Sequence, residues 1–292
     1  MTVDAGTTGA MRHAVIAWER TPTNVMLARA GDWLLVDPVR ALKVLRPGDV
    51  ALARLDVRPT LDGIQVGMEA LGELSARGVT ILNDPSTLLS THDKLLTARL
   101  LAGAGIAHPE TRLLTSVTAA REWSGPVVVK PRFGSWGSYV ERCDSQEELK
   151  RHIASIQDHR WFRSSGALLQ SLVPPSGFDL RLVVARQRVV GAVLRVSADG
   201  EWRTNVALGA HRVATTPPAD AIRLAIEAAG AVNGSLVGVD LLPEGNGWVV
   251  LEVNGAVEFT SEYSFAGDVF AAATEALSRR VEKRPALARA GR

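Results

Sequence analysis

The sequence has little cysteine, little net charge and no long apolar run. A single cysteine, Cys143, in 292 residues excludes an internal disulfide framework and a multi-cysteine zinc site, and we interpret it as an incidental thiol. The formal net charge of +2 leaves no electrostatic footprint for nucleic acid. No apolar stretch is long enough to cross a membrane, and residues 1–10 lack a signal-peptide pattern. We therefore expect a cytoplasmic protein with neither a nucleic-acid nor a membrane partner.

What the chain does contain is the composition of an ordinary enzyme, with 46% hydrophobic and 22% charged residues. Its length allows two or three lobes around a sizeable core. Apolar strands that alternate with helix-like stretches predict a small parallel α/β lobe over residues 11–88. The other expected units are a linking helix within 89–110, a central lobe at 111–175, a third lobe at 176–282, a disordered tail at 1–10 and another tail at 283–292. The expected fold class is α/β, with α+β character in the later lobes.

The most informative stretch is an apolar hairpin that carries acidic residues. Gly238-Val-Asp240 and Leu251-Glu252-Val-Asn254 read as two strands joined by a turn at residues 243–247. Alternation along the strands places Asp240, Glu252 and Asn254 on one face. Oxygen ligands from a rigid hairpin suit Mg²⁺ or Mn²⁺, which leaves its other positions to water and phosphates. A nucleotide is thus the first ligand to expect, although ordinary surface acids on a solvated hairpin face are the alternative.

A glycine loop follows a strand that ends in a lysine. Lys130 precedes the segment Gly134-Ser-Trp-Gly137, where backbone N–H groups can approach phosphate oxygens closely. The segment matches neither the Walker pattern nor the dinucleotide fingerprint. Taken alone, it is as consistent with a plain hairpin loop as with a phosphate loop. Lys94, at the start of a helix expected over residues 91–102, is a second candidate cation.

The order of these motifs resembles the ATP-grasp superfamily, and within it the RimK/LysX-type carboxylate–amine ligases, closer to the LysX branch. The resemblance extends from about His13 to the last helix. It rests on the following segments, in this order: Asn83-Asp-Pro with Asp93-Lys94, Val129-Lys130-Pro131, Gly134-Ser-Trp-Gly137, Asp179-Leu-Arg181, Arg203-Thr-Asn205, Gly238-Val-Asp240 and Leu251-Glu-Val-Asn254. It implies an ATP-grasp fold and an ADP-forming ligase that joins a carboxylate to an amine through an acyl phosphate.

The same resemblance implies roles for individual residues. Nucleotide binding is implied for Lys94, Lys130, Gly134, Ser135, Trp136, Gly137, Gln170, Ser171, Leu172, Val173 and Asp179. The metal ligands would be Asp240, Glu252 and Asn254, and the catalytic groups Arg203 and Asn205. Substrate contacts are expected from Arg181, Arg195 and Glu258, the last as a partner for an ammonium group, with a surface or helix-capping glutamate as the equal alternative. The six histidines are scattered, and His92 is expected at the surface or in a loop rather than as a base.

The chain departs from the family pattern at its substrate end. The family usually carries Arg-Gly-Gly where this sequence has Leu208-Gly-Ala, and a leucine cannot bind a carboxylate as an arginine does. The amine partner is expected to be an amino acid or analogue. The donor could be the terminal glutamate of a small acidic carrier protein, a peptide or a free acid, so a dipeptide or secondary-metabolite ligase is an alternative. A non-catalytic ATP-binding module and a kinase are alternatives of other classes, and a homodimer or homotetramer is the expected assembly.

Overall fold

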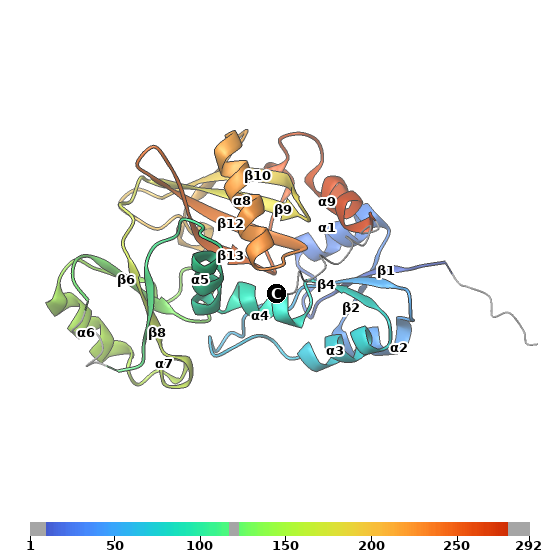
Figure 1. Ribbon diagram of the computed structural model, residues 1–292, viewed down its shortest axis with the longest axis horizontal. Coiled ribbons are helices and arrows are strands. Elements are labelled where there is room, and N and C mark those ends of the chain that lie inside the picture. Colours follow the sequence, from blue (N-terminus) through green and yellow to red (C-terminus); the bar gives the residue numbers. More distant parts are fainter. Residues whose placement is uncertain (1–9, 117–122, 280–292) are drawn as a thin grey trace, which may run out of the picture.

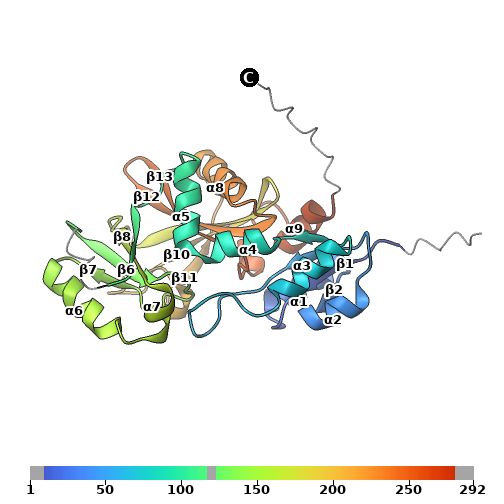
Figure 2. The same cartoon turned by 60° about the horizontal axis from the view of Figure 1, so that its bottom comes forward.

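The computed structural model describes residues 10–116 and 123–279, which form three sheets with helices around them (Figure 1). In Figure 1 the N-terminal sheet lies on the right and a smaller sheet lies on the left, with the third sheet above and between them. The helices α4 (Pro85–His92) and α5 (Lys94–Gly103) run along the middle of the molecule and connect the two ends (Figure 2).

The N-terminal sheet is parallel, in the order β2-β1-β3-β4. Its strands are β1 (His13–Ile16), β2 (Leu34–Val36), β3 (Val50–Ala53) and β4 (Thr80–Leu82), and its helices are α1 (Pro22–Gly31), α2 (Pro38–Val44) and α3 (Met68–Ala76). Both α1 and α2 begin with a proline behind a side-chain cap, Thr21 for α1 and Asp37 for α2. Proline suits the first helical position because its missing N–H would have no intrahelical partner there. The alternation of strand and helix predicted for this part of the chain is confirmed.

The smaller sheet is antiparallel, in the order β5-β8-β6-β7. Its strands are β5 (Thr111–Leu114), β6 (Val127–Pro131), β7 (Glu141–Cys143) and β8 (Ala167–Ser171). The helices α6 (Gln146–Ile156) and α7 (Arg160–Ser165) cover one face through a core that includes Leu149, Ile153 and Phe162. The opposite face carries Lys130 and Gln170, which turn toward the centre of the molecule.

The third sheet has five antiparallel strands in the order β11-β10-β9-β12-β13. These strands are β9 (Phe178–Ala185), β10 (Arg188–Val196), β11 (His211–Ala214), β12 (Leu236–Glu244) and β13 (Gly247–Asn254). One face packs on α8 (Ala219–Ala231) and α5, as the alternating apolar side chains of β9 require. The other face is apolar at one end, where α9 (Val269–Ser278) and the N-terminal lobe cover it. At its opposite end it carries the charged residues Asp179, Arg181, Arg195 and Asp240.

Asn83 ties the N-terminal lobe to this third sheet. Its backbone is left-handed, with a φ of 50°, and its side chain is 1% exposed. The amide nitrogen donates to the carbonyls of Leu236 (2.6 Å) and Gly255 (3.1 Å). The amide oxygen accepts from the backbone of Ser235 (2.8 Å) and Leu236 (3.1 Å). Every hydrogen-bonding group of this buried amide is therefore paired, which fixes the position of the chain where β13 ends.

Two of the expected local boundaries are wrong. The helix expected over residues 91–102 is broken at Asp93, whose backbone is extended and whose carboxylate caps α5 by accepting from the amides of Leu95 and Leu96. Thr91 and His92 thus belong to α4, and α5 begins at Lys94. The turn expected over residues 243–247 is also shorter, because β12 extends to Glu244 and β13 begins at Gly247.

Candidate functional site: two adjoining cavities

A large cavity lies between the smaller sheet and the five-stranded sheet, with about 970 Å³ of empty space that is partly open to solvent. Every residue expected to bind ATP lines it: Lys94, Lys130, Gly134, Ser135, Trp136, Gly137, Gln170, Ser171, Leu172, Val173 and Asp179. Arg195, Arg203, Asn205, Asp240 and Glu252 line the same cavity. The structure thus brings together residues from six strands, the first turn of α5 and three connecting segments. Their individual roles remain predictions.

Lys130 is the most deeply buried cation on the smaller sheet. It lies in β6, is 6% exposed, and its Nζ donates to Oε1 of Gln170 at 2.8 Å. Gln170 in turn donates to the hydroxyl of Thr111, so both partners are held in place. Burial, with a further contribution from nearby Lys94, lowers the pKa of Lys130 to about 8. A lysine that is desolvated in this way interacts strongly with any anion that enters the cavity.

The glycine loop lies against Lys94 and Asn205. Nζ of Lys94 donates to the carbonyl of Gly134 at 2.5 Å and lies 3.6 Å from Glu252. Gly137 has a φ of +76°, and a Cβ at this position would lie 2.8 Å from Oδ1 of Asn205. A glycine is therefore required there both by the backbone conformation and by the close contact. Trp136 also has a positive φ of 62° and is 59% exposed, although it lines the cavity.

At the charged end of the five-stranded sheet, arginine and aspartate side chains form a network of ion pairs. Arg181 holds Asp240 with Nε–Oδ1 and Nη2–Oδ2 distances of 2.5 Å each. Arg195 donates to Asp179 and reaches Oδ2 of Asp240 at 2.8 Å. Burial alone would raise the pKa of the Asp240 carboxyl, but these two arginines hold it well below its usual range. Asp240 is therefore expected to be charged near neutral pH.

The side-chain oxygens of Asp240, Glu252 and Asn254 are of the kind that bind a hard cation, but some of them already have hydrogen-bond partners. Asp240 and Glu252 are direct partners across β12 and β13, and a bulge at Leu251 keeps them on one face. Oε1 of Glu252 accepts from the amide of Asn254 at 3.2 Å. In the described part of the chain, no three His, Cys, Asp or Glu side chains are placed closely enough to hold a metal. A cation here would therefore rely on Glu252, Asn254 and nucleotide phosphates, and would compete with Arg181 for Asp240.

Arg203 and Leu208 both lie against the glycine loop. Arg203 pairs with Glu201 at 2.9 Å (Nε–Oε1) and 2.8 Å (Nη2–Oε2), and its Nη1 donates to the carbonyl of Val140. Leu208, in a short 3₁₀ turn (Val206–Leu208), lies 3.1 Å from the position of a Cβ at Gly137. Position 208, where the family pattern has an arginine, therefore contacts the loop. Leu208 lines neither this cavity nor the second cavity described next.

A second cavity of about 780 Å³, also partly open to solvent, adjoins the first. The two share Ser135, Trp136, Arg195, Asn205 and Glu252, which therefore mark their junction. Arg181, Asn254 and Glu258, three of the expected site residues, line only the second cavity. Arg212, one of the residues that could compensate for Leu208 at the substrate end, also lines it, and so do Asp56 and His92, which sequence reasoning missed as site residues. Asp56 comes from the N-terminal lobe, and no local motif marks it.

His92 is not at the surface, as expected from the sequence, but is 5% exposed at the end of α4. The expectation fails because the chain after β13 packs on it: a Cβ at Gly255 would lie 3.5 Å from Nε2 of His92. Burial, followed by the charge of Lys94, lowers the pKa of His92 to about 4, so its ring is neutral near pH 7. Its Nε2 has no hydrogen-bond partner in the described chain.

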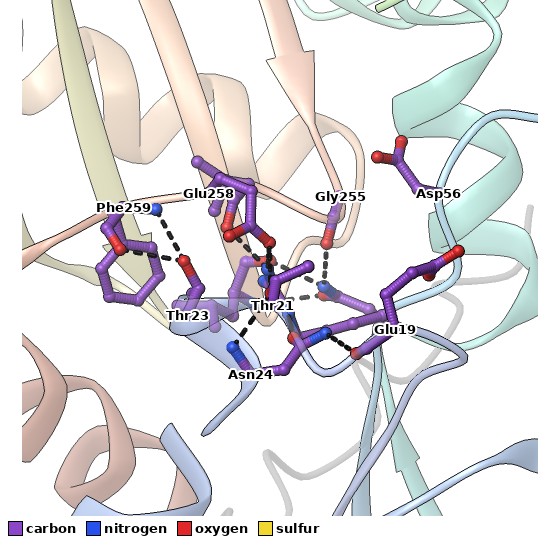
Figure 3. A network of polar contacts seen from close by, with 12 residues as sticks. Glu19, Thr21, Thr23, Asn24, Asp56, Gly255, Glu258 and Phe259 are labelled. Atoms are coloured by element: carbon purple, nitrogen blue, oxygen red, sulfur yellow. Dashed lines mark hydrogen bonds and ion pairs between the residues drawn. The ribbon is translucent and has the colours of Figure 1, made fainter. Parts of the chain in front are cut away.

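Glu258 lies at the seam between the N-terminal lobe and the segment that follows β13 (Figure 3). Its Oε1 accepts from Nη2 of Arg54 at 2.9 Å and from the hydroxyl of Thr21 at 3.0 Å. Arg54 is 3% exposed and also donates to Asn24 and to the carbonyl of Val257. The Glu258 side chain is therefore held in place by these contacts as part of the lining of the second cavity, and is not a free surface group.

Comparison with known proteins assigns the chain to a family. The RimK-like ATP-grasp domain family matches residues 91–270. The alpha-aminoadipate–LysW ligase LysX of Saccharolobus solfataricus is 29% identical over 187 residues, 62% of this chain and 68% of that protein. The tetrahydromethanopterin:alpha-L-glutamate ligase of Methanosarcina acetivorans is 28% identical over 263 residues, 81% of this chain and 78% of its own length.

The fold is also that of known ATP-grasp structures. The crystal structure of a RimK domain protein from Sphaerobacter thermophilus superposes with a TM-score of 0.68 over 92% of this chain and 100% of its own, at 22% identity. The chain therefore belongs to the RimK-like ATP-grasp family, and the expected resemblance to RimK/LysX-type ligases is confirmed. It is an ATP-dependent carboxylate–amine ligase. Among the helices of residues 10–116 and 123–279, none has the length and apolar character to span a bilayer.

Proposed function

We propose that this ligase forms an acyl phosphate where the two cavities meet and passes the acyl group to the amine of an amino acid. The observation that carries the proposal is the arrangement of the cavities. The first cavity gathers Lys94, Lys130 and the glycine loop, which suit a nucleotide. The second opens from the same junction and is lined by Asp56, His92 and Glu258, which can accept hydrogen bonds from an amine.

The chemistry needs positioning and neutralised charge more than a strong base. In the first step the γ-phosphoryl group moves from ATP to the donor carboxylate, which gives an acyl phosphate and ADP. In the second step the amine attacks the acyl carbon, phosphate leaves, and one proton is released as the amide forms. Lys94 and Lys130 would bind the nucleotide phosphates, and Arg203 would lie near the phosphate that is transferred. Asn205, at the junction of the cavities, would contact the acyl centre.

A bound Mg²⁺ or Mn²⁺ would supply charge neutralisation at the phosphates, and Asp240, Glu252 and Asn254 are the proposed residues to hold it. The glycine loop has a separate role in this account. Lys94 contacts its backbone at Gly134, and Arg203 contacts the backbone of Val140, three residues beyond its end. When the loop covers the junction it would exclude water, which otherwise hydrolyses an acyl phosphate.

For the donor, we propose the terminal glutamate of a small acidic carrier protein, which the resemblance to LysX-type ligases implies; the Saccharolobus relative is named for alpha-aminoadipate and LysW. The Methanosarcina relative is named for a pterin donor instead, so a free small acid is the second candidate. The test is a hydroxylamine trap with Mg-ATP and a panel of carboxylates that includes glutamate-ended acidic peptides and proteins. A hydroxamate together with ADP identifies the donor. ADP formation with a donor that never yields hydroxamate or amide would contradict the acyl-phosphate route.

A further inference from the structure

The connection between β3 and α3, residues 54–67, is the longest in the N-terminal lobe and folds as a hairpin. The other strands of the parallel sheet reach their helices through much shorter segments: residues 17–21, 37 and 83–84. Val57 pairs with Ile64 as an antiparallel bridge, and we refer to residues 57–64 as the strap. In Figures 1 and 2 this segment extends from the N-terminal lobe below α4 toward α7. A strand-to-helix connection of this length is uncommon in a compact domain and usually has a function.

The strap packs into two lobes at once. Val57 and Leu61 are each 9% exposed and belong to the apolar cluster that α6 and α7 form with the smaller sheet, together called the smaller lobe. Ile64 belongs instead to the core of the N-terminal lobe. At the tip, Oδ2 of Asp62 pairs with Nη2 of Arg160, the first residue of α7, at 3.1 Å. The strap therefore ties the N-terminal lobe to the start of α7.

The tip of the strap has a backbone conformation that leucine rarely adopts. Leu61 has a φ of 56°, in the left-handed region. Its amide donates to the carbonyl of Arg58 at 2.9 Å, and the carboxylate of Asp62 accepts from the hydroxyl of Thr60 at 2.6 Å. A bulky residue remains in this region only where the surrounding contacts hold it there. The tip is therefore fixed by its own turn and by the smaller lobe together.

The start of α7 also contacts the chain directly after the glycine loop. The ring of Tyr139, two residues beyond Gly137, lies with its centroid 4.9 Å from that of His159 and 5.5 Å from that of Trp161. Tyr139 likewise has a left-handed backbone, with a φ of 55°. His159, Arg160 and Trp161 are consecutive, so neighbouring side chains contact the glycine-loop segment and the strap. The start of α7 thus connects the two.

We propose that the strap acts through α7 on the glycine loop, and that Leu61, Asp62 and Arg160 are positioning residues for nucleotide binding. The inference rests on the proposed function where it assigns the glycine loop to the nucleotide. If the smaller lobe moves away from the N-terminal lobe, the tip loses its apolar contacts and its ion pair. Since these contacts exist only while the two lobes are together, they favour the arrangement in which the loop lines the first cavity.

Hydrogen exchange in the full-length enzyme without nucleotide tests the connection by itself. Leu61→Asn removes the apolar side chain but retains a residue that tolerates the left-handed backbone. The amides of Ser138 and Val140 are hydrogen-bonded within the loop segment. Peptides spanning residues 138–143 and α7 should exchange about 10-fold faster in Leu61→Asn than in wild type, while β12 exchanges at the wild-type rate. Unchanged exchange at residues 138–143 would overturn the proposal.

Release of a fluorescent ADP analogue with Mg²⁺, followed by stopped flow, measures the consequence for the nucleotide. Release should be about 10-fold faster in Leu61→Asn, and about 3-fold faster in Asp62→Asn and in Arg160→Met, because Arg160 is 77% exposed and such ion pairs contribute little. The double variant should release no faster than either single variant. Arg163→Met, which breaks an exposed pair with Asp158 in the same helix, is the matched control. Wild-type release in Leu61→Asn would overturn the proposal.

Two further readouts separate this result from a folding defect and from the proposed function. The number of nucleotide sites per chain, from calorimetric titration, should stay at the wild-type value, because misfolded protein lowers this number and leaves the release rate unchanged. Tyr139→Phe keeps the ring and should match wild type, whereas Tyr139→Asn should release as fast as Leu61→Asn. If wild type binds no Mg-ADP, the assignment of the loop to the nucleotide fails, and faster exchange in Leu61→Asn still supports the action of the strap on the loop.

Discussion

The nucleotide cavity and the acceptor cavity are built in different ways. The first is lined by residues of the two later sheets and the glycine loop, all within the span that the family covers, residues 91–270. The second adds Asp56 from the N-terminal lobe, outside that span, and Glu258, which is anchored by Arg54 and Thr21 of the same lobe. Under the proposed function, the chemistry common to the family would lie in the part of the fold that the family covers, and acceptor selectivity would lie where the lobes meet.

The largest expected effect comes from a residue that borders both cavities. Glu252→Gln should lower turnover by about 10³-fold or more, because it removes a charge from the proposed metal site next to Lys94. ADP release and amide formation, measured with the trapped donor, should fall together. Glu244→Gln, at the exposed end of β12 in the same hairpin, is the control and should keep wild-type rates. Activity retained in Glu252→Gln would refute the metal assignment.

The second-largest effect on catalysis is expected from a residue that holds the lining of the acceptor cavity in place. Arg54→Met leaves Asn24, Val257 and Glu258 without their partner, so the free energy of unfolding should fall by about 1–3 kcal/mol. Glu258 should also lose its orientation, which would raise KM for the acceptor while KM for ATP stays within about 2-fold. Denaturant unfolding and steady-state kinetics measure the two effects. Equal changes in both KM values would show that the cavities are not independent.

A pH effect should be confined to the nucleotide cavity. The pKa of Lys130 is lowered to about 8, so the side chain is charged at pH 7 and loses its proton as the pH rises toward 9. A neutral lysine attracts phosphates less, so Mg-ADP should bind roughly 10-fold more weakly at pH 9 than at pH 7. Lys130→Met should bind weakly at both pH values, without this step. A pH-independent affinity in wild type would contradict the assignment of Lys130 to the phosphates.

The smallest effect is expected at Cys143, which borders neither cavity. Burial, reinforced by the nearby Glu141, raises the pKa of its thiol to about 11, so almost no thiolate exists near pH 8. The native protein should therefore react with aromatic disulfide reagents far more slowly than the unfolded chain. Cys143→Ala should keep kcat and both KM values within about 2-fold of wild type. Rapid native labelling with loss of activity would show that this core opens in the native protein.

The sequence predicts the nucleotide cavity better than the acceptor cavity for a physical reason. Lys130, the glycine loop and the acidic residues of the hairpin are local signals in the sequence, although a bulge at Leu251 is needed to bring Asp240 and Glu252 to one face. Asp56, His92 and Arg212 meet only after the N-terminal lobe packs on the chain that follows β13. Asn83, which makes that packing possible, could be read as a turn residue but not as a bridge to Leu236 and Gly255. The break between α4 and α5 depends likewise on Asp93, which caps α5 and pairs with Arg132, a residue distant in the sequence.

The most direct test of the account follows the oxygen atoms of the donor. A donor carboxylate labelled with ¹⁸O at both oxygens is converted with Mg-ATP and an amino acid, and the products are examined by mass spectrometry. An acyl phosphate formed at the junction of the two cavities predicts one ¹⁸O in inorganic phosphate, one in the amide, and none in ADP. Label that stays out of inorganic phosphate, or that enters AMP, would contradict the proposed chemistry.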